Sequence, residues 1–127
     1  MAKAVLDASA VLALAKGEPG AEIVSGLISL CVVGAVNHCE IVSKLTERDA
    51  SPDTIRDSLK RFNYRIVDFD ADLAFRAGVL WRDTRALGLS LGDRACLALA
   101  QREGLPVFTA DKRWAELDLG VDIRVIR

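Results

Sequence analysis

The sequence predicts an α/β protein, a single three-layer α/β/α domain over residues 1–127 with a mainly parallel central sheet. Short apolar runs typical of buried strands alternate with longer segments of helical periodicity, which is the pattern of parallel sheets covered on both faces. With 127 residues, 51% of them apolar, the chain can build one buried core and is too apolar to be disordered. Neither a repeat nor a linker-like segment divides it.

The first strand and helix are marked by clear boundaries. The apolar run Lys3–Leu6 predicts a strand that ends at Asp7, and Ala8–Lys16 follows as a helix that the Gly17–Gly20 segment breaks. Ala21–Leu30 has apolar residues at helical spacing and predicts a second helix.

The middle of the chain continues the alternation. Cys31–Val33 predicts the second strand, and a further helix opens at Asn37. Ser51-Pro52 is a strong helix start, because serine caps helices and proline suits the first turn, and this helix runs towards Arg61.

The second half adds three strands. Arg65–Phe69 predicts the third strand, and Asp70–Ala86 predicts a long helix that stops near Gly88. The remaining elements are a helix Ser90–Gly104, a strand Leu105–Thr109, a short helix Lys112–Leu117 and a strand Ile123–Ile126. The large apolar side chains expected in this part of the core are Phe75, Val79, Trp81 and Trp114.

Charge and cysteine content limit the possible functions. Seventeen Lys and Arg against eighteen Asp and Glu give a net charge of −1, so a nucleic-acid function requires a local site and not a generally basic surface. Three cysteines without a CxxC pair predict neither a disulfide framework nor a zinc site, and a cytoplasmic location is expected. No apolar stretch reaches the roughly 20 residues of a membrane span.

Four acidic residues are candidates for a functional site. Asp7 and Asp111 each follow a predicted buried strand, at the carboxyl edge where parallel sheets bind their ligands. Glu40 and Asp93 lie near the start of otherwise apolar helices that are expected to pack on the sheet.

Helix capping is the alternative explanation for these acids. Asn37 with Glu40 and Ser90 with Asp93 match capping boxes, and the other two acids suit N-cap positions. Capping does not explain why Asp7 directly follows a buried strand among apolar neighbours, nor does it predict that all four acids converge.

Convergent carboxylates have a specific chemistry. Without a cation they repel one another, and at least one of them holds a proton at neutral pH. Mg²⁺ or Mn²⁺ removes this conflict, since both ions take oxygen ligands and use only one or two direct carboxylates. These ions bind phosphate oxygens and lower the pKa of bound water, which is the chemistry of nucleases.

Four segments of the chain carry a family resemblance: Val5–Ala10, Asn37–Leu45, Leu89–Ala98 and Val107–Asp111. In this order the chain resembles the PIN domain, and most closely the VapC toxins of toxin–antitoxin pairs, over essentially its whole length. The resemblance implies a Mg²⁺- or Mn²⁺-dependent endoribonuclease that acts on RNA. It also implies a homodimer and a cognate antitoxin, a small DNA-binding protein that blocks the site.

The same resemblance assigns roles to individual residues. The residues implied to be catalytic are Asp7, Glu40, Asp93 and Asp111. Asp7 and Asp93 are the implied direct metal ligands, while the other two acids complete the site through water or a second ion. Ser9 and Thr109 match small polar positions that supply supporting hydrogen bonds.

Other residues and other protein classes remain possible at this point. Arg94 and Lys112, each beside a site acid, can steady a phosphate or only solvate a helix face, and His38 is expected as a polar surface group. An aspartyl-phosphate phosphatase usually requires a second Asp where Ser9 stands. A non-catalytic regulatory or phospho-receiver-like module requires a receiving Asp after a central strand, and Asp68 is expected inside the predicted strand Arg65–Phe69 instead.

Overall fold

The central sheet of the protein is entirely parallel. A computed structural model describes all residues 1–127. Its five strands lie in the order β3-β2-β1-β4-β5, and every neighbouring pair is parallel. Their bounds are β1 Val5–Leu6, β2 Val32–Gly34, β3 Arg65–Val67, β4 Val107–Thr109 and β5 Ile123–Val125. The predicted α/β class is confirmed, and the sheet is wholly rather than mainly parallel.

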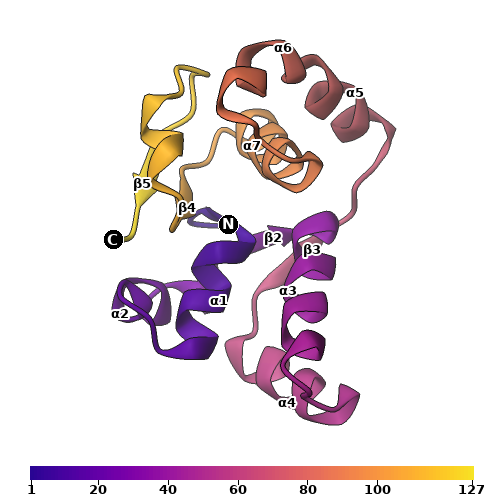
Figure 1. The fold of residues 1–127 in the computed structure, drawn as a ribbon, viewed down its shortest axis with the longest axis vertical. Helices are drawn as coiled ribbons and strands as arrows, with labels where there is room; N and C mark the ends of the chain where they lie inside the picture. Colours follow the sequence, from indigo (N-terminus) through magenta and orange to yellow (C-terminus); the bar gives the residue numbers. More distant parts are fainter.

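Helices cover both faces of the sheet (Figure 1). On one face lie α1 Ala8–Lys16, α2 Ala21–Ser25, α3 Ala35–Glu47 and α4 Pro52–Phe62, and on the other α5 Ala71–Val79, α6 Trp81–Thr84 and α7 Leu91–Glu103. Short 3₁₀ helices follow as η1 Ile28–Leu30, η2 Arg85–Leu87 and η3 Lys112–Glu116. None of the helices has the length and apolar character needed to cross a membrane.

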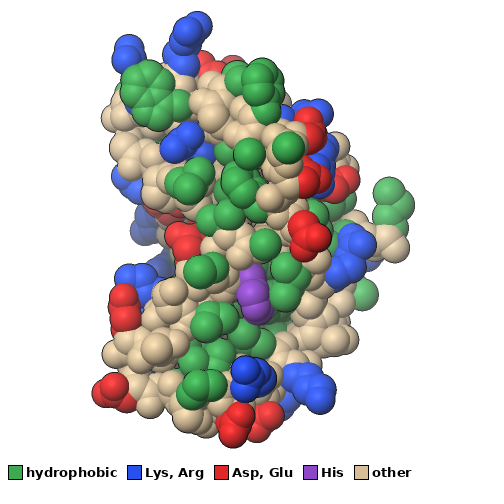
Figure 2. All heavy atoms as spheres, turned by 90° about the vertical axis from the view of Figure 1, so that its right-hand side faces the viewer, with side chains coloured by type: hydrophobic (Ala, Val, Ile, Leu, Met, Phe, Trp, Pro, Cys, Tyr) green, Lys and Arg blue, Asp and Glu red, His purple; other side chains and the backbone are tan.

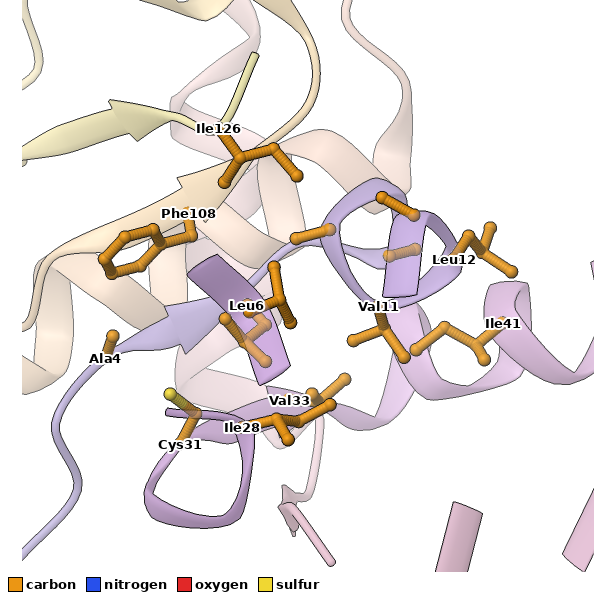
Figure 3. Close-up of a cluster of buried hydrophobic side chains, with 14 residues drawn as sticks. Ala4, Leu6, Val11, Leu12, Ile28, Cys31, Val33, Ile41, Phe108 and Ile126 are labelled. Carbon is orange, nitrogen blue, oxygen red and sulfur yellow. The ribbon is translucent and has the colours of Figure 1, made fainter. Parts of the chain in front are cut away.

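Alternate strand residues feed two separate hydrophobic clusters. Successive side chains of a strand point to opposite faces of a sheet. The first cluster, drawn in Figure 3, receives Leu6, Val33 and Phe108 and packs them against α1 and α3. The second receives Val5, Val32 and Val107 and packs them against α5, α7 and Trp114. The sheet is therefore buried on both sides, as its continuous apolar strands predict.

Three predicted helix boundaries were wrong. The helix α3 begins at Ala35, two residues before Asn37, with Gly34 as its N-cap. The predicted helix Ala21–Leu30 ends as an α-helix at Ser25 and continues as the 3₁₀ turn η1. The predicted helix Asp70–Ala86 is interrupted at Leu80 and forms three short elements.

The prediction that Phe75, Val79 and Trp81 lie in the core was also wrong. These side chains are 74%, 60% and 52% exposed. The buried side of the same segment is formed by other residues, Leu73, Ala77, Leu80 and Thr84. Trp114, by contrast, is fully buried as predicted.

The strand order creates a topological switch point between β1 and β4, at the centre of the sheet. From β1 the chain moves outward to β2 and β3, then crosses to β4 and β5 on the other side of β1. The direction of winding therefore reverses between β1 and β4. In open parallel sheets, ligands bind beyond the carboxyl ends of the strands at such a reversal. Asp7 and Thr109 stand at this point, at the ends of the two central strands.

Candidate active site

Asp7 lies in a buried position at the ends of the neighbouring strands β1 and β4. It follows β1 and holds the N-cap position of α1, but its side chain makes no capping hydrogen bond. Instead Ser9 Oγ donates to Asp7 Oδ2 at 2.6 Å, and Thr109 Oγ1 donates to the same oxygen at 3.0 Å. The N-cap explanation is therefore right for the backbone and wrong for the carboxylate, which Ser9 and Thr109 support as expected.

The environment of Asp7 disfavours its negative charge. Asp7 is 5% exposed. Burial raises the pKa of Asp7 from its usual 3.8 to about 6, against the opposing effect of its hydrogen bonds. The nearby charges of Asp93 and Glu40 raise this pKa further. A buried carboxylate that other carboxylates crowd is the arrangement that a divalent cation relieves.

Glu40 is held against the start of α7 by a buried asparagine. Asn37 Nδ2 donates to Glu40 Oε1 at 2.9 Å and also to the carbonyl oxygen of Gly92 at 3.0 Å. A Cβ atom at Gly92 would lie 2.5 Å from Glu40 Oε1, so any other residue here would displace the Glu40 carboxylate from this position. Burial and the charge of Asp93 raise the pKa of Glu40. The predicted capping box of Asn37 is wrong, because this side chain joins two helices instead.

Replacing Asn37 by Ala is expected to lower the free energy of unfolding by about 1–3 kcal/mol, since it removes two hydrogen bonds made by a fully buried side chain. Urea denaturation measures the change. Gln101→Ala is the matched control, because Gln101 Nε2 donates a single bond to the Leu119 carbonyl oxygen. Only Asn37→Ala is expected to lower RNA cleavage as well, through the released Glu40. Equal cleavage by both variants contradicts this positioning role.

Asp93 serves as a helix cap and faces the other acids. Ser90 Oγ accepts from Asp93 N at 3.2 Å, and Ser90 N donates to Asp93 Oδ2 at 2.9 Å, which completes the predicted capping box. The same carboxylate raises the pKa of both Asp7 and Glu40. Capping and proximity to the site are therefore both true of Asp93.

Asp111 is the acid that sequence reasoning placed least well. It caps η3 by accepting from Arg113 N, and the Arg113 guanidinium donates to both of its oxygens, with Nη2 to Oδ2 at 2.7 Å. These bonds from Arg113 hold the pKa of Asp111 below its usual value. Asp111 N donates to Thr109 Oγ1, which in turn bonds Asp7. Asp111 thus adjoins the seat of Asp7, with its charge already paired.

The structure brings three of the four predicted acids into one electrostatic cluster. The charges of Asp93 and Glu40 both raise the pKa of Asp7, and the charge of Asp93 also raises the pKa of Glu40. Asp111 is instead paired with Arg113. No three acidic, histidine or cysteine side chains lie close enough to enclose a metal ion by themselves. This is compatible with Mg²⁺, which commonly takes only one or two carboxylates and keeps several waters.

The oxygens left free in the cluster suit such an ion. Both hydroxyl bonds to Asp7 converge on Oδ2, and no protein group donates to Oδ1. Asp93 bonds through Oδ2 and Glu40 through Oε1, so each also retains an oxygen without a hydrogen bond in the protein. Carboxylate oxygens are the donors that Mg²⁺ and Mn²⁺ prefer.

The basic residues proposed from the sequence lie elsewhere. Arg94 reaches away from its neighbour Asp93 and donates to the carbonyl oxygen of Ala77 in α5. Lys112 is exposed and forms no ion pair. The cation that does contact a predicted site acid is Arg113, which was not among the residues predicted from the sequence. Its signal was the Asp-x-Arg spacing directly after a buried strand.

His38, the only histidine, lies apart from the acids. Its Nδ1 is 2.7 Å from the Tyr64 hydroxyl oxygen, and burial lowers the pKa of His38. In Figure 2 it sits at the middle of the face formed by the α3 and α5 side of the molecule, among hydrophobic side chains. It is half-buried rather than a free surface group.

The fold and the site together define a class: an α/β protein whose parallel sheet carries a buried acidic cluster at its central carboxyl edge. The PIN domain model matches residues 4–119. The chain belongs to the PIN domain family. No curated protein matches the sequence significantly.

Solved structures share the whole fold at low sequence identity. A toxin–antitoxin complex from Klebsiella pneumoniae is 18% identical with a TM-score of 0.78, covering 98% of each chain. A DNA-bound VapBC from Salmonella typhimurium is 18% identical with a TM-score of 0.73, covering 100% of each chain. VapBC-5 from Mycobacterium tuberculosis is 21% identical with a TM-score of 0.58, covering 100% of this chain and 99% of the other.

Proposed function

We propose that this protein is a Mg²⁺- or Mn²⁺-dependent endoribonuclease, the toxin of a toxin–antitoxin pair. The observation that carries the proposal is the seat of Asp7, a buried carboxylate crowded by Asp93 and Glu40 at the reversal point of the sheet. Membership of the PIN family and likeness to VapBC structures support it.

Each acid has a proposed task in the hydrolysis of a phosphodiester. Asp7 and Asp93 hold the metal ion, and Glu40 and Asp111 orient the attacking water and complete the acidic site. A bound divalent cation supplies charge neutralisation at the scissile phosphate and lowers the pKa of water. Ser9 and Thr109 fix the rotamer of Asp7, so that its Oδ1 remains available.

The proposed partners are a second copy of the chain and a cognate antitoxin. The similar structures include toxin–antitoxin complexes, which supports an antitoxin here as well. Phe75 and Val79, one helical turn apart on α5, are exposed apolar side chains that a partner could cover. Hydrophobic side chains gather along the face shown in Figure 2. A homodimer that covers this surface is part of the proposal.

Incubation of the purified protein with total RNA tests the proposal. Cleavage is expected with Mg²⁺ or Mn²⁺ and is expected to stop in EDTA, because the cation activates the attacking water and neutralises charge at the scissile phosphate. The cleaved ends, mapped by sequencing, identify the target. Parallel incubations with p-nitrophenyl phosphate and acetyl phosphate test the phosphatase and phospho-receiver alternatives. Turnover of either compound without RNA cleavage contradicts the proposed ribonuclease.

A further inference from the structure

Arg113 is a half-exposed arginine that the acidic site holds in one orientation. It lies in η3 and is 52% exposed along its side chain. Its Nε and Nη2 donate to the two oxygens of Asp111, and its Nη1 donates to the carbonyl oxygen of Leu87 at 2.7 Å. The guanidinium is thus fixed from two sides, by η3 itself and by η2.

Two donors of this guanidinium remain unused. An arginine side chain has five N–H groups in a rigid plane. One on Nε and one on Nη2 bond Asp111, and one on Nη1 bonds Leu87. One N–H on Nη1 and one on Nη2 therefore have no hydrogen-bond partner in the protein. Because the side chain is half exposed, these groups are open to a ligand that bears oxygen acceptors.

A second Asp–Arg pair shows that local spacing alone does not produce this arrangement. Arg124 donates to Asp122 at the same two-residue spacing, through Nε and Nη2 to a single oxygen. Arg124 lies on β5 and Asp122 directly before it, and Arg124 makes no further hydrogen bond to a carbonyl. Arg113 instead bonds both oxygens of its partner and a second element, and the charge of Asp93 also acts on it. The surrounding structure therefore fixes the orientation of Arg113 at the edge of the acidic site.

The charge of the site explains what Arg113 is suited to bind. Asp7, Glu40 and Asp93 form a cluster in which none of the three is in an ion pair, and the charge of Lys44 offsets the raised pKa of Glu40 only in part. An RNA backbone approaching that cluster meets repulsion, and a fixed guanidinium beside it supplies planar donors of the kind that match phosphate oxygens. We propose that Arg113 binds a phosphate of the RNA substrate through its two free N–H groups while it holds Asp111 in place. This inference rests on the proposed ribonuclease function.

The test measures RNA binding without metal and cleavage with it. Binding of a fluorescein-labelled, mixed-sequence single-stranded RNA is followed by fluorescence anisotropy in EDTA at several salt concentrations. Arg113→Gln is expected to weaken binding about tenfold and to lower the slope of log K against log salt by about 0.7, the value for one phosphate contact on a single strand. Arg113→Lys is expected to retain the slope, since it keeps the charge.

Two comparisons isolate the phosphate contact. Asp111→Asn is also compared with the double variant that carries Asp111→Asn and Arg113→Gln. Neither protein has an unpaired Asp111 charge that could affect binding. The double variant is again expected to show the lower slope of log K against log salt. Arg124→Gln, the matched pair on β5, is expected to leave binding unchanged. A lowered Tm for Arg113→Gln with unchanged affinity and slope reduces Arg113 to a structural clamp and overturns the inference.

The result for the unmodified protein separates this inference from the proposed function. Cleavage of total RNA with Mg²⁺ but no binding of the probe in EDTA overturns the metal-independent contact and leaves the ribonuclease proposal standing. Neither binding nor cleavage overturns both.

Discussion

Replacing Asp93 by Asn is expected to lower the rate of RNA cleavage by about 10²–10³-fold or more, because it removes a proposed ligand of the ion that stabilises the transition state. Asp7→Asn is expected to have a loss of the same order. Initial rates on a mapped RNA substrate at saturating Mg²⁺ measure both. These are the two acids in the cluster to which we assign direct metal contact.

The capping role of Asp93 requires its own control. Ser90→Ala removes the hydroxyl half of the capping box but leaves the Asp93 carboxylate and its bond from Ser90 N. It is expected to cost about 1 kcal/mol of stability with cleavage retained. If Asp93→Asn loses stability to a similar extent and still cleaves RNA at the normal rate, Asp93 is only a cap and the site assignment fails.

Asp7→Asn is further expected to raise stability without metal, by an amount that depends on pH. In the native protein the pKa of Asp7 is about 6 against 3.8 for an ordinary aspartate. The folded state therefore binds more protons than the unfolded state between these values, and the stability due to Asp7 falls as pH rises through this window. The full loss, reached above pH 6, is about 3 kcal/mol. Asparagine carries no charge, so the Asp7→Asn variant avoids this loss of stability.

Urea denaturation in EDTA between pH 4 and pH 7 measures this effect. The stability difference between Asp7→Asn and the unmodified protein is expected to grow across the range and then level off. Asp68→Asn, an exposed carboxylate beside β3, is the control and is expected to show no such growth. Mg²⁺ is expected to stabilise the unmodified protein and to have little effect on Asp7→Asn, since the ion binds only the folded site. If the stability difference between the two proteins does not change with pH, the pKa of Asp7 is not raised in the folded protein.

The sequence was most informative where polar residues or glycines mark the ends of apolar segments. The helix α1 was predicted at its observed bounds because Asp7 precedes it and Gly17, with φ of 66°, ends it. The helix α7 was similarly framed by Ser90 and by Gly104. No comparable mark stands at Leu80, where the predicted long helix breaks into α5 and α6.

The buried face of α5 could not be predicted, because apolar residues lie on two sides of this helix. Leu73 and Ala77 recur at helical spacing, and so do Phe75 and Val79, so periodicity alone could not choose the buried set. The structure buries the first pair against α7 and leaves the second exposed. Only the packing of a neighbouring element decides such a case.

The candidate site was predictable as a set of acids but not as a set of contacts. The positions of Asp7, Glu40 and Asp93 relative to strand ends and helix starts predicted their proximity. The pairing of Asp111 with Arg113 depends on how the side chain turns after β4, which spacing does not specify. Their catalytic roles remain predictions for the variants above.

The connection between Thr109 and Asp7 joins residues 102 positions apart in the chain. The central strand β1 is therefore synthesised long before its neighbour β4. Such distant pairing makes closure of the sheet a late event in folding. A nascent chain that has reached residue 104 already carries Asp7, Glu40 and Asp93, but not the strand that seats the first of them. The acidic cluster can therefore assemble only after β4 has been synthesised.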